Sequence, residues 1–161
     1  MRIREFESEL ILPLSREQVF LFFADATNLE AITPPWLHFH ILTPMPIEMR
    51  AGVQIDYRLK IHGWPVRWRS RISVWDPPHR FVDEQILGPY RLWQHTHEFL
   101  EVSGGTRVRD HVRYAVPMDW LLHRLFVRRD LEEIFRYRAM AIRRHCLQSH
   151  ASHATAGPCC T

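Results

Sequence analysis

Hydrophobic and polar side chains alternate with a period of two over most of this chain. Residues 3–12 place apolar side chains and glutamates on alternating positions, which is typical of a strand with one solvated face. The same period predicts further strands over residues 38–42, 53–60, 64–74, 80–87, 90–102 and 106–116. Asp76-Pro77-Pro78-His79 and Ser103-Gly104-Gly105 carry the residues expected of turns between strands.

Two segments change to helical spacing instead. Ser15 is a candidate N-cap with Gln18 as its capping-box partner, and a short amphipathic helix follows it. A second helical turn is expected over residues 28–32, before Pro34 and Pro35. A long helix is predicted from a candidate N-cap at Asp119 to about Cys146.

The order of elements is one strand, two short helices, about six strands and one long helix. We therefore expect an α+β fold in which a curved antiparallel sheet of about seven strands wraps around the C-terminal helix. One helix cannot fill the inner face of so wide a sheet, so an internal cavity is expected. The predicted domain spans residues 1–146, and the Ser/His/Ala-rich residues 147–161 are predicted to form a disordered tail.

Composition narrows the class of protein. The length of 161 residues fits one domain, and a net charge of +3 gives at most weak attraction to anionic partners, so no nucleic acid is expected as a partner. Two of the three cysteines lie in the last three residues, so no pair of cysteines is expected to form a disulfide bond across the core. This favours a reducing compartment. No signal-peptide pattern and no apolar run of about 18 residues is present. The expectations are a cytoplasmic location, no stable membrane insertion, and a monomer or homodimer.

Together with this order of elements, two stretches carry a family resemblance: Leu14-Ser15-Arg16-Glu17-Gln18-Val19-Phe20, and residues 80–99 with their Gly88-Pro89-Tyr90-Arg91-Leu92-Trp93-Gln94-His95-Thr96-His97 segment. The chain resembles the START-like or SRPBCC superfamily, which includes polyketide cyclases, Bet v 1-type plant allergens and lipid-transfer domains. The resemblance covers residues 1 to about 146. It implies the helix-grip fold and a hydrophobic cavity between sheet and helix. It implies no metal or other cofactor and transfers no catalytic residue.

Strand parity predicts which side chains face that cavity. On residues 90–102 the aromatic face carries Trp93, His95, His97 and Phe99. On residues 106–116 the inner face carries Val108, Asp110, Val112 and Tyr114, since the other face is basic. By the same test Tyr57, Trp64 and Trp68 point inward, and Ile134, Phe135 and Arg138 of the long helix are placed to roof the cavity.

Two points of the register stay open. If the hairpin loop consists of the two glycines, Phe99 lies opposite Asp110; if it begins one residue earlier, His97 lies opposite Asp110. Both registers leave Asp110 within one diagonal step of His97. The inner face of strand 80–87 is either Phe81, Asp83 and Gln85 or Val82, Glu84 and Ile86.

The first functional hypothesis is binding of a hydrophobic small molecule, such as a lipid, an isoprenoid or an aromatic polyketide-like compound. Its candidate ligand-binding residues are Tyr57, Trp64, Trp68, Trp93, His95, His97, Asp110, Tyr114, Phe135 and Arg138. The first alternative is a cyclase or dehydratase in which His97 or His95 is the base and Asp110 its partner. The second alternative is a protein-interaction module that uses the basic face of the long helix.

The polar inner group of His95, His97 and Asp110 has two further interpretations. It is a buried hydrogen-bond network that only stiffens the sheet, or it is a zinc site built on the two histidines with Asp110 as third ligand. No cysteine lies nearby and the resemblance implies no metal, so the sequence analysis predicts none.

Overall fold

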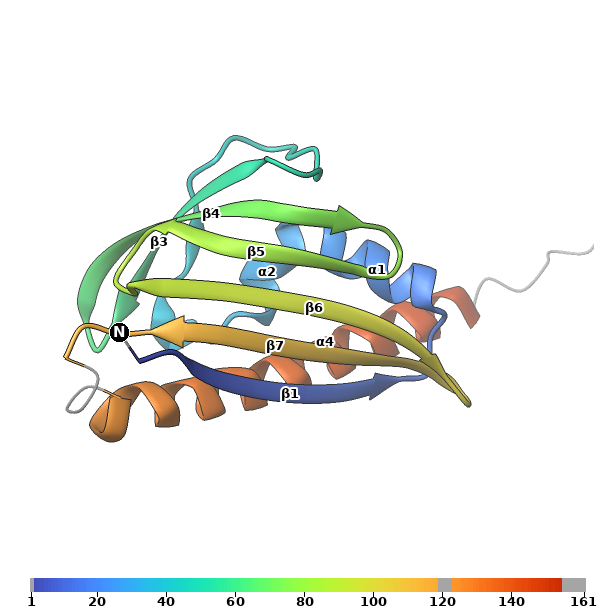
Figure 1. The fold of residues 1–161 in the computed structure, drawn as a ribbon. Coiled ribbons are helices and arrows are strands. Elements are labelled where there is room, and N and C mark those ends of the chain that lie inside the picture. The colour runs from blue at the N-terminus through green and yellow to red at the C-terminus, as the bar shows by residue number, and fades with distance from the viewer. Residues whose placement is uncertain (1, 119–122, 155–161) are drawn as a thin grey trace, which may run out of the picture.

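A curved antiparallel sheet lies over one long helix, and two short helices close one side (Figure 1). The structure, a computed structural model, describes residues 2–118 and 123–154. The strands are β1 (Arg4–Leu12), β2 (His40–Ile41), β3 (Gln54–Ile61), β4 (Trp64–Asp76), β5 (Arg80–Leu87), β6 (Leu92–Val102) and β7 (Gly105–Ala115). Their order in the seven-stranded sheet is β1-β7-β6-β5-β4-β3-β2. This is the α+β helix-grip fold that the sequence predicted.

The helices are α1 (Arg16–Ala24), α2 (Thr27–Ile32), the 3-10 turn η1 (Pro35–Leu37), the π-helical turn η2 (His123–Val127) and α4 (Arg128–Ala154). The predicted capping box at α1 is confirmed: the Gln18 amide donates to Ser15 Oγ, and the Ser15 amide donates to Gln18 Oε1. The candidate N-cap Asp119 lies outside the described residues.

The long helix ends later than the sequence predicted. α4 continues past Cys146 to Ala154, so the predicted boundary at residue 146 falls inside a helix and not at the start of a disordered tail. Residues 147–154 lack a periodic apolar face, which is why the pattern alone ended the helix early. Residues 155–161 of the predicted tail lie outside the described part of the chain. None of the described helices is long and apolar enough to cross a membrane.

The two halves of α4 have different surroundings. Its C-terminal half places Ala141, Ile142 and Cys146 in a buried core with Phe20 of α1 and Phe99 of β6. Its N-terminal half packs Leu131 and Phe135 against Val112, Tyr114 and Val116 on one side. Its other side faces an internal cavity, which is described below.

A β-bulge changes the inner face of β4 near its end. Ile72 pairs with Asp83, but Val74 pairs with Val82, so Ser73 is an extra residue. The alternation of inner and outer side chains therefore shifts by one residue after Ser73. Trp75 points to the inner face, where the regular alternation predicted Val74. Its ring packs against Phe81 with centroids 5.7 Å apart.

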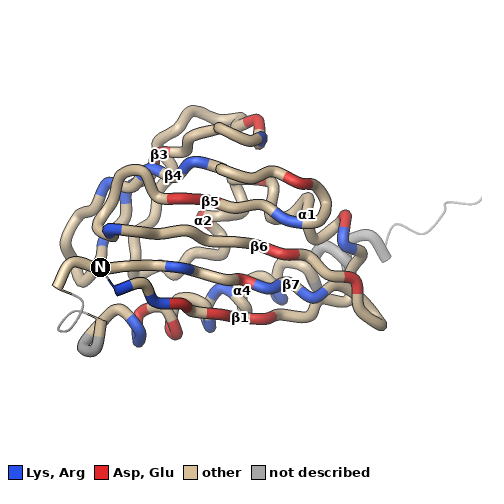
Figure 2. The backbone as a smooth tube through the Cα atoms, in the orientation of Figure 1, with Lys and Arg blue, Asp and Glu red and all other residues tan. Residues whose placement is uncertain are grey.

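The convex face of the sheet is charged. Figure 2 shows acidic residues on β1 beside basic residues on β7. Arg109 contacts Glu7 at 3.1 Å, and His111 contacts Glu5 at 3.6 Å. The predicted basic helix face is likewise mixed, since Arg129 bonds to Glu133 one turn along α4.

Candidate functional site

An internal cavity of about 520 Å³ lies between the sheet and the helices. Most of the side chains around it are apolar, including Phe22, Phe23, Leu29, Ile32, Ile55, Tyr57, Leu59, Trp68, Trp93 and Ile134. They come from α1, α2, β3, β4, β6 and α4. The volume lies in the range of ordinary small-molecule pockets.

The exposed lining residues mark the mouth of the cavity. They gather in the β3–β4 turn, at η1 and on the first turns of α4. His62 of the turn reaches Asp130 of α4, with 2.8 Å between His62 Nε2 and Asp130 Oδ2. This contact joins the two sides of the mouth.

The polar floor of the cavity begins with the β6–β7 hairpin. Its loop begins at Ser103, since Val102 pairs with Gly105. His97 therefore lies directly opposite Asp110, and His95 lies opposite Val112. This is the second of the two registers that the sequence allowed.

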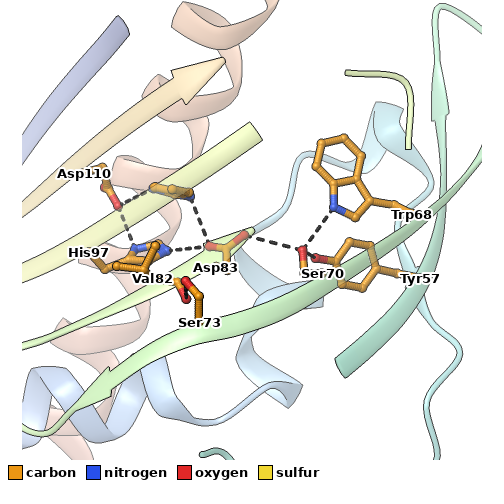
Figure 3. A network of polar contacts seen from close by, with 9 residues as sticks. Tyr57, Trp68, Ser70, Ser73, Val82, Asp83, His97 and Asp110 are labelled. Carbon is orange, nitrogen blue, oxygen red and sulfur yellow. Dashed lines mark hydrogen bonds and ion pairs between the residues drawn. The ribbon is translucent and has the colours of Figure 1, made fainter. Parts of the chain in front are cut away.

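Four side chains form a closed square of alternating carboxylates and imidazoles (Figure 3). Asp110 Oδ1 accepts from His95 Nε2 at 2.9 Å and lies 2.8 Å from His97 Nδ1. On the opposite side, Asp83 Oδ2 lies 3.2 Å from His97 Nε2 and 3.6 Å from His95 Nδ1. The 2.8 Å contact is an ion-pair distance, because the His97 ring is not aligned for a hydrogen bond there.

Asp83 extends this square toward β3 and β4. Asp83 Oδ1 accepts from Ser70 Oγ at 3.5 Å, and Ser70 in turn accepts from the Tyr57 hydroxyl and from Trp68 Nε1. Ser70 thus uses its proton and both lone pairs, which satisfies three buried polar groups at once. The network runs without interruption from Asp110 on β7 to Tyr57 on β3.

Aromatic rings hold the imidazoles in place. His97 stacks on Phe81 with 4.2 Å between centroids, and its ring lies tilted against that of His95 at 3.8 Å. Phe135 of α4 lies edge-on to His95 at 5.5 Å. The rings restrict rotation of both histidines, so their nitrogens keep fixed directions toward the two carboxylates.

Both carboxylates are ionised in this environment. Burial alone would raise the pKa of Asp110 and of Asp83. The hydrogen bond from His95 and the close contact of His97 at Asp110, the hydrogen bond from His97 at Asp83, and the charges of both rings outweigh burial and lower the pKa of each acid. Arg138 of α4 adds its charge in the same sense at Asp83.

The two histidines shift in opposite directions. Burial favours the neutral form of both rings. For His97 the close contacts and charges of Asp110 and Asp83 outweigh burial and raise its pKa above the ordinary 6.5. For His95 the charge of His97 adds to burial, and its pKa is lowered below 6.5 despite Asp110. Of the two rings, His97 is therefore the one that binds a proton more readily.

With this geometry established, comparison with known proteins identifies the family. Residues 12–143 match the family described as polyketide cyclase / dehydrase and lipid transport. The chain belongs to this family. The match spans α1 to β7 and the first part of α4, and it confirms the SRPBCC-type resemblance. No curated protein sequence matches the chain.

Solved structures show the same fold for this polyketide cyclase / dehydrase and lipid transport domain. Protein Ms6760 from Mycobacterium smegmatis is 16% identical with a TM-score of 0.69, covering 93% of this chain and 99% of its own. TTHA0849 from Thermus thermophilus is 22% identical with a TM-score of 0.66, covering 91% and 99%. A norcoclaurine synthase point mutant from Thalictrum flavum is 14% identical with a TM-score of 0.70, covering 92% and 97%.

The polyketide cyclase / dehydrase domain brings most predicted site residues to one place. Tyr57, Trp68, Trp93, His95, His97, Phe135 and Arg138 all line the cavity. Asp110 lies behind the histidines, and Tyr114 is buried in the core beside Phe135 without lining the cavity. Trp64 contradicts its prediction: it follows the β3–β4 turn, does not line the cavity and is 76% exposed.

The sequence analysis missed part of the site. Asp83 was left as one of two options, and the structure settles it: β5 turns Phe81 and Asp83 inward, opposite His97 and His95. The wall from α1 and α2 was also absent from the predicted site. The run Phe22-Phe23 was its signal, because two adjacent aromatics on a short helix exceed what one packed face needs.

Proposed function

We propose that this domain binds a mostly apolar small molecule that carries one polar group. The observation behind this is the cavity itself: a mostly apolar interior of about 520 Å³ whose largely buried polar groups Asp83, His95 and His97 converge on one floor. The apolar walls supply affinity in proportion to the area buried, at about 25 cal/mol per Å².

The polar floor would fix the orientation of the bound molecule. Asp83, His95 and His97 face the cavity, whereas Asp110 supports them from behind. Arg138 lines the same cavity from α4. A lipid, isoprenoid or aromatic polyketide-like molecule with a hydroxyl, carbonyl or carboxyl group at one end fits this distribution.

Native mass spectrometry of the gently purified protein tests the proposal directly. A small molecule retained in a complex of one to one, and released on unfolding, is the expected result. An environment-sensitive fluorescent fatty-acid analogue provides a second readout, and it should bind with one site per chain.

A pair of variants places that site. Ile134→Trp fills the cavity from α4 and should abolish binding of the probe, whereas Leu100→Trp adds the same volume on the exposed face of β6. The second variant should bind like the wild type. Equal binding by both variants, or binding lost in both while both stay folded by circular dichroism, would contradict an internal site.

A cyclase or dehydratase is the second candidate, because a histidine held by a carboxylate faces the cavity. His97 has Asp110 on one side and Asp83 on the other, which is the arrangement of a positioned acid/base group. If a substrate is found, Asp110→Asn should lower kcat by about 10²–10⁴-fold. Unchanged turnover in this variant and in His97→Gln would exclude the acid/base role.

A further inference from the structure

We propose that Asp83, His95 and His97 bind one divalent first-row transition-metal ion at the floor of the cavity. Each residue offers one ligand atom there, and the three ligand atoms lie within 4.8 Å of one another. Asp83 Oδ2 faces His95 Nδ1 and His97 Nε2. Asp83 of β5 is the cross-strand partner of His95 of β6, and His97 lies two residues further along β6 on the same face. Two imidazoles and one carboxylate are a donor set that zinc and iron(II) sites use.

The spacing of the ligand atoms fits a metal centre. Asp83 Oδ2 lies 3.2 Å from His97 Nε2 and 3.6 Å from His95 Nδ1. Bonds of about 2.0–2.1 Å in a tetrahedral site place neighbouring ligand atoms about 3.3–3.4 Å apart. The two separations from Asp83 Oδ2 thus lie within a few tenths of an ångström of those in a tetrahedral site, and the ligand atoms of the two histidines lie within 4.8 Å of each other.

Asp110 supplies the support that such ligands require. Each histidine turns one nitrogen to Asp83 and the other to Asp110: His95 Nε2 and His97 Nδ1 lie 2.9 and 2.8 Å from Asp110 Oδ1. A carboxylate behind a ligating histidine fixes its tautomer and raises its basicity. When an ion binds, the proton of each neutral ring would lie on the nitrogen that faces Asp110, and the other nitrogen would coordinate the ion beside Asp83.

The charges of the site favour a cation at this position. Asp83 and Asp110 place two carboxylates within 4 Å of the same pair of buried imidazoles. Burying such groups is costly without a compensating charge, and a divalent ion beside Asp83 would supply it.

The remaining coordination positions would point into the cavity. Asp83, His95 and His97 all line it, whereas Asp110 does not. Three protein ligands leave at least one open position, where an oxygen or nitrogen of a bound molecule or of water can coordinate. This inference goes beyond the proposed ligand binding, since metal binding can be measured with no organic molecule present.

Titration of the apo-protein with Zn²⁺, followed by calorimetry, tests the proposal. The full chain should carry Cys159→Ser and Cys160→Ser, so that these two thiols do not contribute. One equivalent of Zn²⁺ is expected to bind. Co²⁺ then reports the ligands, and the expected spectrum is that of a four- or five-coordinate nitrogen and oxygen site without a thiolate band.

Matched variants locate the ion. Asp83→Asn and His97→Gln keep the shape of the ligand and should weaken Zn²⁺ binding by at least 100-fold. Asp110→Asn, behind the ligands, should weaken it by about 10–100-fold. His62→Asn is the control, because it removes a histidine paired with an acid at the rim of the same cavity. It should leave the affinity unchanged.

Three results would overturn the proposal. They are no stoichiometric Zn²⁺ binding, binding that survives Asp83→Asn and His97→Gln together, or a Co²⁺ spectrum of the hexa-aqua type. Circular dichroism shows which variants are folded. If His97→Gln does not fold, Asp83→Asn alone decides the location of the site. Binding of the fluorescent probe is measured separately in the presence of chelator. A failure of Zn²⁺ binding therefore leaves the ligand-binding proposal standing, and a failure of probe binding leaves the metal proposal standing.

Discussion

His97 and Asp110 are direct cross-strand partners, and 2.8 Å separates His97 Nδ1 from Asp110 Oδ1. This pairing depends on where the β6–β7 loop begins, because a two-residue slip would place Phe99 opposite the acid instead. The chemistry of the cavity floor is thus fixed by the position of one tight turn.

Asp110→Asn should destabilise the metal-free protein by about 3 kcal/mol, because it breaks a buried charged pair. The pKa of Asp110 is lowered in the folded state, so its contribution is present above about pH 3.8 and is lost as the pH falls. Urea unfolding in chelator should show the difference between wild type and variant at pH 7 and a smaller one in acid. Glu7→Gln, which removes a surface partner of Arg109, should cost much less.

NMR titration of the metal-free protein should separate the two histidines. The pKa of His97 is expected above 6.5 and that of His95 below it. The raised pKa of His97 means that its charge stabilises the fold below pH 6.5, and this contribution is lost as the pH rises through the folded-state pKa. Asp83→Asn should lower the pKa of His97, since it removes one of two flanking carboxylates. Identical titration of both rings would contradict the assigned charges.

Ser70→Ala should cost more stability than Tyr57→Phe. The first change leaves two buried donors, the Tyr57 hydroxyl and Trp68 Nε1, without an acceptor, at about 1–3 kcal/mol each. The second removes one donor and leaves Ser70 bonded to Trp68, at about 1 kcal/mol. Urea unfolding of both variants measures the order, and the reverse order would mean that Ser70 is not the shared acceptor.

His62→Asn should speed the exchange of a cavity-bound probe several-fold with little change in stability. It removes the contact to Asp130 that joins the two sides of the mouth, yet Asn tolerates the positive φ of 49° at this turn. Stopped-flow displacement of the fluorescent probe gives the rate. His40→Asn is the control, since His40 pairs with Glu30 away from the cavity lining. Equal rates for wild type and His62→Asn would exclude access through this mouth.

Gly105→Ala should destabilise the protein by about 3 kcal/mol, because an added Cβ would lie 2.0 Å from the carbonyl oxygen of Leu12. Gly104→Ala, one residue earlier, has open space around it and carries only the cost of its φ of 83°, about 1–2 kcal/mol. Thermal unfolding compares the two. A smaller loss of stability for Gly105→Ala than for Gly104→Ala would show that β1 can move away from the hairpin.

The sequence predicted the sheet and its inner faces where the alternation is regular. Trp93, His95 and His97 were placed correctly because β6 has no interruption between its pairings with β5 and β7. The pattern failed where the backbone departs from period two. Ser73 in β4 is such a place, since an extra residue there exchanges Val74 for Trp75 on the inner face.

Asp83 shows what periodicity cannot decide. Both faces of β5 offer a carboxylate, so the pattern in residues 80–87 is symmetrical. The turn after β5 resolves it in the structure, where the Gln85 side chain bonds to both the amide and the carbonyl of Tyr90. Asp110 was the third metal ligand suggested by the sequence, but it faces His95 Nε2 and His97 Nδ1. Asp83 faces the other two nitrogens, His95 Nδ1 and His97 Nε2, which are the ones turned toward the proposed ion.

The square of two acids and two imidazoles also bears on how this protein can diverge. A single oxygen of Asp110 serves both rings, so losing one ring leaves a buried carboxylate facing too few donors, and losing Asp110 disorients both rings at once. Stepwise substitution therefore passes through intermediates that are less stable than either end state. Among descendants of a common ancestor, residues 83, 95, 97 and 110 should accordingly be inherited together or replaced together.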